Sequence, residues 1–239
     1  MAETKPLAGQ NALVTGASRG IGFAIAEKLA AMGANLAICA RNESALHEAA
    51  ARLRKHGGEV FLMPVDVTQA AEIERLIREV QRTLGPVDIL VNNAGVGEFG
   101  PFFEQSELEW DTTLDTNLKS VFLLSRAVAP EMIRRRTGHI INIASLAGKN
   151  AFAGGTIYCA SKWGLLGLTQ CMAEDLRANG IRASAVCPGS VETDFSPHTG
   201  KDASKMLQPA DVAHAVAMLV TQAPQSFISE ISMRPTQKP

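Results

Sequence analysis

The chain has 239 residues, of which 46% are hydrophobic and 20% charged, a composition that excludes a disordered, coiled-coil or collagen-like protein. Its net charge of −1 provides no field to hold a nucleic-acid backbone or an anionic membrane surface, so neither partner is expected. The four cysteines and five histidines lack zinc-ligand spacings, so we expect no metal and interpret the thiols as buried residues of a reducing compartment. No segment resembles a signal peptide or a membrane span, so we predict a soluble, cytoplasmic protein.

Short apolar runs alternate with longer segments of helical period from one end of the chain to the other. Strands are predicted at residues 11–14, 36–40, 60–65, 87–91, 139–143, 181–186 and 228–233. Helices are predicted at residues 21–33, 46–54 and 73–80, in a long region ending near residue 136 and interrupted or kinked near Pro130, at residues 158–177, and from about Pro209 onward.

The order and composition of these elements define a fold class. Strands that are continuously apolar are covered by helices on both faces. Strict β-α-β alternation requires parallel pairing with right-handed crossovers. We therefore predict an α/β doubly wound, Rossmann-type three-layer sandwich with a parallel sheet of about seven strands. No linker or repeat interrupts the pattern, so residues 1–239 are interpreted as one domain.

A glycine-rich loop follows the first predicted strand, with the sequence G-A-S-R-G-I-G over residues 16–22. Glycines in such a turn let the backbone approach a pyrophosphate, and the N-terminus of the next helix attracts the phosphates. Gly16, Ser18, Arg19, Gly20, Ile21 and Gly22 are therefore candidate dinucleotide contacts. The same stretch matches the G-x-S-x-G elbow of serine hydrolases, with Ser18 as nucleophile. That alternative is disfavoured, because only one strand precedes Ser18 and its histidine would have to be His198 or His214.

The end of the second predicted strand indicates which dinucleotide is bound. An acid at this position binds the ribose 2′-hydroxyl of NAD, whereas a neutral residue beside an arginine admits the 2′-phosphate of NADP. Here the strand ends in Ala40 and is followed by Arg41 and Asn42. Arg19 can approach the same phosphate from the glycine loop, and two guanidinium groups would bind it through charge-assisted hydrogen bonds. The pattern favours NADP.

Three further side chains form a candidate catalytic cluster. Tyr158 is the chain's one tyrosine, and Lys162 follows it one helical turn later on the same helix face. Ser145 ends the fifth predicted strand, where it would line the cofactor crevice. A free tyrosine titrates near pH 10, and a cation about 4 Å away in a medium of dielectric constant about 20 would lower its pKa by roughly three units. A phenol tuned in this way could exchange a proton with a carbonyl or alcohol oxygen.

Taken together, these motifs resemble the short-chain dehydrogenase/reductase family over residues 9–222. The resemblance rests on the segment from Thr15 to Gly22, Asn92-Asn-Ala-Gly95, Asn117, Ser145, Tyr158-x-x-x-Lys162 and Pro188-Gly189. It implies that Tyr158 is the general acid/base, that Lys162 tunes it and holds the nicotinamide ribose, that Ser145 binds the substrate oxygen, and that Asn117 positions a water of a proton relay. It further implies cofactor contacts from Asp66, Val67, Asn93, Ala94, Gly95, Pro188, Gly189, Val191 and Thr193.

The resemblance also frames the expected reaction, an NADPH-dependent reduction of a small ketone or aldehyde, or its reverse. Two alternatives stay open, a 3-oxoacyl-thioester reductase of fatty-acid type and a non-catalytic NADP-sensing protein. In this family, residues 190–208 would form a lid over the substrate; Phe195, Pro197, His198 and Met206 suggest a moderately apolar pocket without an arginine in the lid. Family members usually form dimers or tetramers through the Tyr-Lys helix, so a homo-oligomer is expected.

Overall fold

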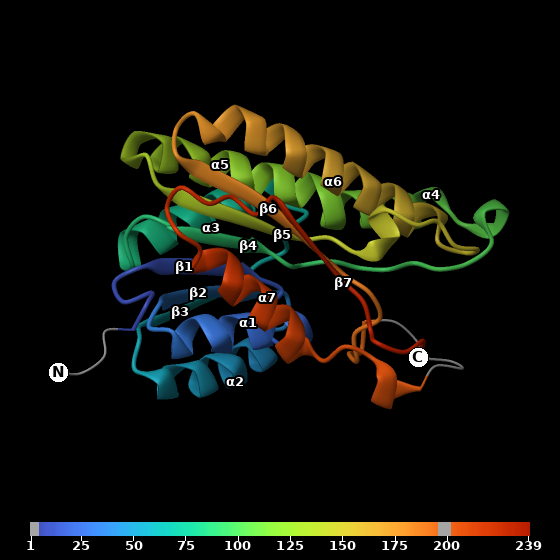
Figure 1. The fold of residues 1–239 in the computed structure, drawn as a ribbon, viewed down its shortest axis with the longest axis horizontal. Coiled ribbons are helices and arrows are strands. Elements are labelled where there is room, and N and C mark those ends of the chain that lie inside the picture. The colour runs from blue at the N-terminus through green and yellow to red at the C-terminus, as the bar shows by residue number, and fades with distance from the viewer. Residues whose placement is uncertain (1–4, 196–201) are drawn as a thin grey trace.

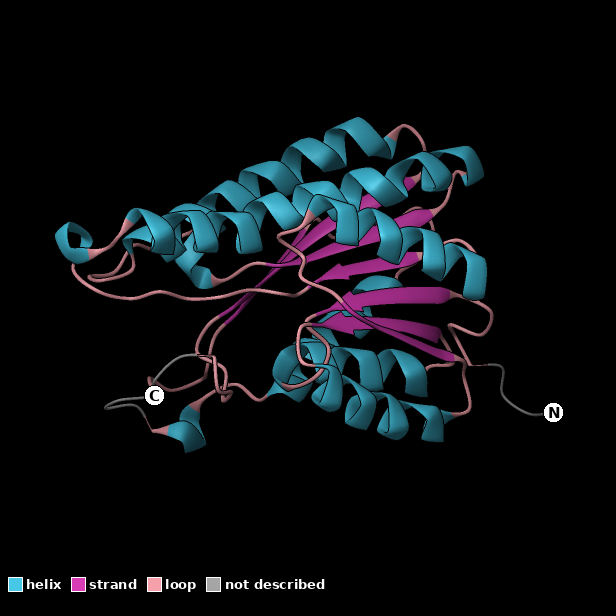
Figure 2. Cartoon of the chain, turned by 180° about the vertical axis from the view of Figure 1, so that it is seen from behind, coloured by secondary structure: helices cyan, strands magenta, loops and turns pink. Residues whose placement is uncertain are grey.

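The computed structural model describes residues 5–195 and 202–239 and builds them around one parallel sheet (Figures 1 and 2). The strand order is β3-β2-β1-β4-β5-β6-β7, and every neighbouring pair is parallel. The strands are β1 (Asn11–Thr15), β2 (Asn35–Ala40), β3 (Val60–Pro64), β4 (Ile89–Asn92), β5 (Gly138–Ile143), β6 (Ile181–Pro188) and β7 (Glu230–Met233). The predicted seven-stranded Rossmann-type sandwich is confirmed.

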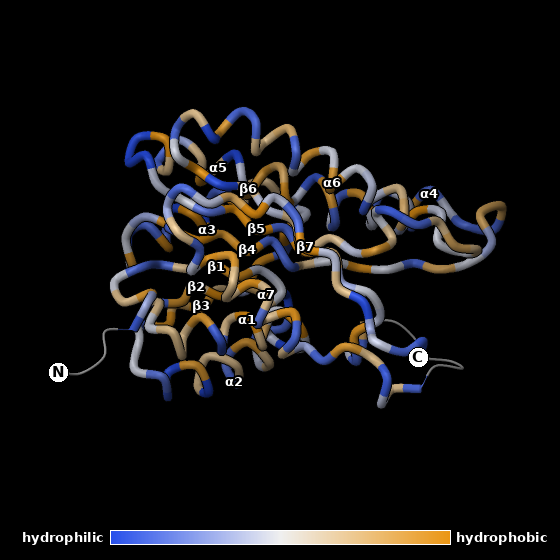
Figure 3. The backbone as a smooth tube through the Cα atoms, in the orientation of Figure 1, coloured by the Kyte–Doolittle hydropathy of each residue, from blue (hydrophilic) through white to orange (hydrophobic). Residues whose placement is uncertain are grey.

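Helices cover both faces of this sheet, as Figure 1 shows. One face carries α1 (Gly20–Ala31), α2 (Glu43–Leu53) and α7 (Pro209–Val220); the other carries α3 (Ala70–Thr83), α4 (Glu107–Leu114), α5 (Ser120–Arg135) and α6 (Thr156–Arg177). All five residues of β1 are buried, and the strands form the apolar interior seen in Figure 3. Because helices bury both faces of the sheet, its strands are apolar at successive positions and do not alternate between apolar and polar residues.

The chain changes direction across the sheet at β1. Strand β1 pairs with β2 on one side and with β4 on the other, so the first three strands extend one way and the later strands extend the other way. In doubly wound sheets, this switch point leaves a crevice outside the carboxyl ends of the strands, where ligands bind. The loops after β1, β4, β5 and β6 all meet at that edge.

The long helical region before β5 differs from the prediction at its irregular position. Helix α5 continues through Pro130 to Arg135, so the predicted interruption there is wrong. A proline removes one backbone donor, but here the helix is held by four buried apolar side chains on its sheet-facing side: Val121, Leu124, Val128 and Met132. The irregularity is instead a π-helical turn at Asp115–Lys119, which contains the buried Asn117. Such single turns are often found at functional sites.

The cysteines, the segment 190–208 and the lengths of the helices can also be compared with the sequence predictions. Cys39, Cys159 and Cys187 are buried as predicted, whereas Cys171 is exposed on the solvent face of α6, opposite the face that contacts the sheet. The two ends of the predicted lid segment lie side by side, because Val191 and Leu207 form a bridge in which Leu207 N–H donates to Ser190 O at 3.0 Å. Pro197 and His198 lie outside the described residues. Within residues 5–195 and 202–239, no helix is long and apolar enough to cross a membrane.

Candidate active site

A cleft of about 1470 Å³ opens at the carboxyl edge of the sheet. Small-molecule pockets usually measure about 300–1000 Å³, so this cleft has room for a dinucleotide and a second reactant. It collects nearly all of the residues predicted from sequence: Gly16, Ser18, Arg19, Gly20, Ile21, Gly22, Ala40, Arg41, Asn42, Asp66, Val67, Asn93, Ala94, Gly95, Ser145, Tyr158, Lys162, Pro188, Gly189, Val191 and Thr193. Asn117 is an exception, since it is fully buried and is not among the lining residues. Met206, expected in the substrate pocket, is another, because it is buried and does not line the cleft.

The glycine loop is shaped by two positions that accept no side chain. Gly16 has a φ of +64°, and a Cβ there would lie 2.9 Å from Ala94 Cα. A Cβ on Gly22 would overlap the carbonyl oxygen of Gly16 and the side-chain amide of Asn93. Helix α1 begins at Gly20 with no side chain capping its N-terminus. The loop thus brings bare backbone and a helix N-terminus to the cleft, which is the arrangement that binds phosphates.

Asn93 fixes this loop to the neighbouring strand. Its side-chain amide donates to the carbonyl oxygen of Thr15 at 2.9 Å, and its backbone N–H donates to Thr15 Oγ1 at 3.0 Å. These bonds join the ends of β1 and β4 at the switch point. Asn93 therefore stabilises the edge of the sheet beside the cleft.

Arg19, Arg41 and Asp194 bring charged groups to the cleft from three different loops. Arg41 is exposed after β2, and the side-chain oxygen of Asn42 accepts a hydrogen bond from Ala45 N, which makes Asn42 the N-cap of α2. Arg19 forms an exposed ion pair with Asp194 at 3.4 Å, a partner that the sequence did not indicate. Since Asp194 lies in the segment after β6, this ion pair joins that segment to the glycine loop.

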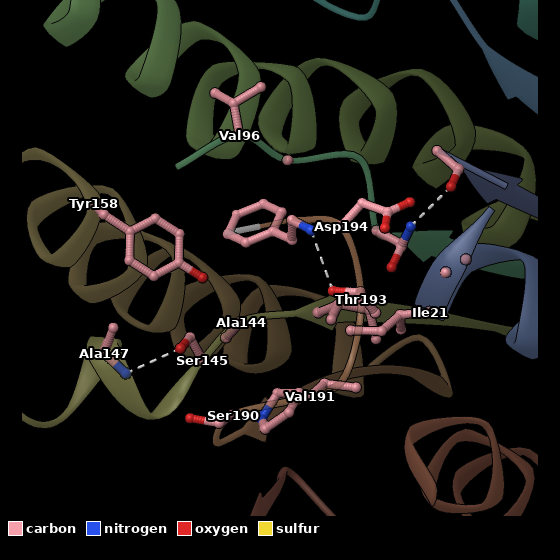
Figure 4. A pocket seen from close by; sticks show the side chains of 18 of the residues that line it. Ile21, Val96, Ala144, Ser145, Ala147, Tyr158, Ser190, Val191, Thr193 and Asp194 are labelled. Carbon is pink, nitrogen blue, oxygen red and sulfur yellow. Dashed lines mark hydrogen bonds between the residues drawn. The ribbon is translucent and has the colours of Figure 1, made fainter. Parts of the chain in front are cut away.

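Tyr158 and Ser145 present hydroxyl groups to the same part of the cleft (Figure 4). Tyr158 lies in the first turn of α6, and Ser145 lies two residues beyond β5. Ser145 Oγ accepts a hydrogen bond from Ala147 N at 3.0 Å, which fixes the loop that carries it. Burial raises the pKa of Tyr158 to about 12, and the hydrogen bond with Ser145 opposes that rise.

The ammonium group of Lys162 is buried near the ring of Tyr158. Its Nζ donates to the carbonyl oxygen of Ile143 at 3.0 Å and lies 5.8 Å from the centroid of the Tyr158 ring. Burial lowers the pKa of Lys162 to about 8. The expected fall in the pKa of Tyr158 is therefore wrong for this structure, because desolvation raises the pKa of the phenol and Lys162, which is bonded to Ile143, is not among the groups that lower it. At neutral pH the phenol is protonated.

Asn117 supports the site from behind. Its amide donates to Val96 O at 2.8 Å and to Ser161 Oγ at 3.0 Å, while its oxygen accepts from Val96 N at 2.8 Å. These bonds connect the π-helical turn to the loop after β4 and to helix α6. The side chain therefore fixes two walls of the cleft relative to one another.

Two sets of lining residues were not foreseen. Phe99 and Phe152 lie on the loops after β4 and β5, and each is about half exposed. Residues 234–239, which follow β7, also line the cleft and bring Arg234 and Lys238 to it. The position of this tail could have been inferred, because the chain leaves every parallel strand at the carboxyl edge. No sequence signal marked the two phenylalanines.

The serine-hydrolase alternative finds no support in this arrangement. Ser18 lies in the glycine loop after the first strand, and His214 is exposed on α7 and does not line the cleft. His198 lies outside the described residues. A nucleophilic serine needs a base within hydrogen-bonding distance, and none of the described histidines lines this cleft.

Comparison with known proteins agrees with the fold and shows the family. Residues 10–204 match the family model described as short chain dehydrogenase. An oxidoreductase of Staphylococcus saprophyticus is 36% identical over 94% of this chain and 96% of its own length. The ketoacyl reductase HetN of Nostoc sp. is 37% identical over 90% of this chain and 76% of its own length.

Two solved structures extend this similarity to three dimensions. A metagenomic short-chain oxidoreductase in complex with NADP has 46% identity and a TM-score of 0.87, with 98% of this chain and 100% of that chain covered. An alcohol dehydrogenase of the archaeon Thermococcus sibiricus, complexed with 5-hydroxy-NADP, has 31% identity and a TM-score of 0.88, with coverage of 96% and 98%. The fold and site define a Rossmann-type oxidoreductase. The chain belongs to the short-chain dehydrogenase/reductase family.

Proposed function

We propose that this protein is an NADPH-dependent oxidoreductase that reduces a ketone or aldehyde to an alcohol, and that can run the reverse reaction. The observation that carries the proposal is that Tyr158, Ser145 and Lys162 line one cleft together with a glycine loop suited to phosphates, with Lys162 Nζ 5.8 Å from the centroid of the Tyr158 ring. A cleft holding a phenol, a hydroxyl and a buried ammonium is equipped to bind and protonate one oxygen atom.

NADP is the proposed cofactor because the residues present fit it. The cradle formed at Gly16 and Gly22 would be filled by any side chain, and the lining residues after β2 are Ala40 and Arg41, with no acid to repel a 2′-phosphate. Arg19 and Arg41 would hold that phosphate, and Lys162 would hold the nicotinamide ribose. When bound, the nicotinamide supplies or accepts the hydride.

The protein's own contribution is to orient the substrate and move a proton. Ser145 donates a hydrogen bond to the substrate oxygen, and Tyr158 gives its phenolic proton to that oxygen as the alcohol forms. Because the pKa of Tyr158 is raised, the phenol carries its proton at pH 7 and is ready to act in the direction of reduction. The reverse reaction needs the phenolate, so alcohol oxidation would accelerate at alkaline pH. Asn117 would hold the loop at Val96 and help to position a water of the proton relay.

The test is a panel of ketones, aldehydes and 3-oxo esters mixed with enzyme and NADPH while nicotinamide absorbance is followed, with NADPH binding measured by calorimetry. Turnover of some panel members together with NADPH binding is expected. Binding without turnover would instead support a non-catalytic NADP-sensing protein. Absence of both would contradict the proposal.

A 3-oxoacyl-thioester reductase is a second candidate, favoured by the 37% identity with the ketoacyl reductase HetN. The C-terminal segment from Phe227 to Pro235 departs from the T-G-x-x-x-x-V-D-G-G pattern of the bacterial thioester reductases. Adding a 3-oxoacyl thioester to the panel separates the two candidates. A kcat/KM for the thioester far above that of simple ketones would favour the second.

A further inference from the structure

Aromatic rings converge on Tyr158 from two sides of the cleft. The Phe99 ring meets the Tyr158 ring edge-on, with centroids 5.4 Å apart and an interplanar angle of 62°. The Phe195 ring is tilted against Tyr158 at 5.8 Å, and Phe152 lies against Phe99 at 6.2 Å. These spacings are the ones at which aromatic pairs attract one another. Two phenylalanines from different loops therefore contact the ring of the proposed proton donor, and Phe152 from a third loop extends the cluster through Phe99.

Glycines make room for these rings. A Cβ on Gly97 would lie 2.8 Å from the Phe99 ring and 2.9 Å from the Phe195 ring. A Cβ on Gly155 would lie 2.5 Å from the Phe152 ring. The two loops are also joined directly, because Gly100 N donates to Gly154 O at 3.0 Å. The aromatic walls are thus held by the backbone on both sides of the cleft.

The rings are not buried by the protein alone. Phe99, Phe152 and Phe195 remain 41%, 49% and 42% exposed although all three line the cleft. Large apolar side chains gathered at a pocket and left about half exposed mark a surface that a ligand covers. The other described lining residues of these loops are mostly small or aliphatic, such as Val96, Ala147 and Ala151.

We infer that this end of the cleft is an aromatic subsite, and that the preferred substrates are ketones or aldehydes carrying a flat aromatic ring next to the carbonyl group. Once the carbonyl oxygen lies at Tyr158 and Ser145, the attached ring contacts the exposed faces of Phe99 and Phe195. An aromatic pair contributes a factor of roughly 2 to 12 in affinity beyond the area that it buries. The inference rests on the proposed function, since it specifies the substrate of that same site.

The test compares acetophenone with cyclohexyl methyl ketone, which has a saturated ring of similar size. For each enzyme form, kcat/KM is measured with NADPH for both ketones and their ratio is taken, so that the intrinsic reactivities cancel between forms. We expect Phe99→Leu and Phe195→Leu each to lower the aryl-to-cyclohexyl ratio about three- to tenfold. The matched control is Phe103→Leu, since Phe103 is 75% exposed on the neighbouring segment and does not line the cleft; its ratio should stay within twofold of the wild-type value.

The possible results separate the two proposals. Calorimetric NADPH binding by each variant shows that it is folded. An unchanged ratio in both folded wall variants would overturn the aromatic subsite, as would an enzyme that reduces other carbonyl compounds but neither of these ketones. If no carbonyl compound in the wider panel is reduced, the proposed function fails and the subsite fails with it.

Discussion

Lys162 offers a direct link between the site and the stability of the fold. The side chain is 5% exposed, and burial lowers its pKa from 10.5 to about 8. At pH 7 the lysine is charged in both the folded and the unfolded chain, so the full desolvation cost is present. A shift of 2.5 pKa units corresponds to a cost of about 3.4 kcal/mol. Lys162→Met removes this charge and also the hydrogen bond to Ile143, which contributes about 1 kcal/mol.

The variant should therefore be more stable than the wild type by about 2 kcal/mol at pH 7, while losing nearly all reductase activity. The sign of the pH dependence follows from linkage. Between pH 8 and 10.5 the folded lysine has lost its proton while the unfolded lysine keeps it, so wild-type stability rises with pH in this window. The stability difference between the two proteins should shrink by about 2 kcal/mol between pH 7 and pH 9.5.

Urea denaturation of both proteins at pH 7 and at pH 9.5 measures this difference. Other titrating groups are shared by the two proteins and cancel in the comparison. A variant that is less stable than the wild type at pH 7, or a difference that does not change with pH, would refute the reasoning.

Three other predictions address the cofactor site and the core. Replacing Ala40 with Asp and Arg41 with Ala should lower the NADPH-to-NADH ratio of kcat/KM about 100-fold. The double variant loses a charge-assisted hydrogen bond to the 2′-phosphate and places a negative charge beside it. An unchanged ratio would mean that the 2′-phosphate is bound elsewhere. Gly22→Ala should weaken NADPH binding roughly 10- to 100-fold in calorimetry, because there is no room for the added methyl group. The control is Gly167→Ala, which should leave NADPH binding unchanged because the space around its Cβ is open. Burial lowers the pKa of His139 to about 3. Between pH 6.5 and 3, therefore, the histidine is protonated in the unfolded chain and neutral in the folded chain. The wild type should lose about 2 kcal/mol more stability than His139→Gln between pH 6.5 and 4.5 in urea titrations, and parallel curves would contradict the assignment.

The sequence predicted the structure best where a local pattern of residues is compatible with only one local structure. Uninterrupted apolar runs such as residues 36–40 occur where helices cover both faces of a sheet, so the strand positions followed from hydrophobicity. Parallel pairing followed from the alternation of strands and helices. The glycines at 16 and 22 and the i, i+4 pair of Tyr158 and Lys162 are likewise local patterns. All four of these residues line the cleft.

Features that depend on contacts between distant segments were harder to predict. The π-helical turn at Asp115–Lys119 is accompanied by bonds from Asn117 to Val96 and Ser161, which lie 21 and 44 residues away. The raised pKa of Tyr158 reflects burial by the assembled loops, which sequence spacing does not report. The convergence of Phe99 and Phe195 on the phenol depends on loop conformations with no periodic signal.

The central claim is that the Tyr158 hydroxyl delivers the proton to the substrate oxygen. Single-turnover reduction of a ketone by Tyr158→Phe, with NADPH affinity measured in parallel, examines it most directly, because the substitution removes one oxygen atom and little else. We predict that hydride transfer falls at least about 1000-fold, within the range attributed to a positioned general acid, while the Kd for NADPH changes less than threefold. Hydride transfer at a near wild-type rate in this variant would contradict the account.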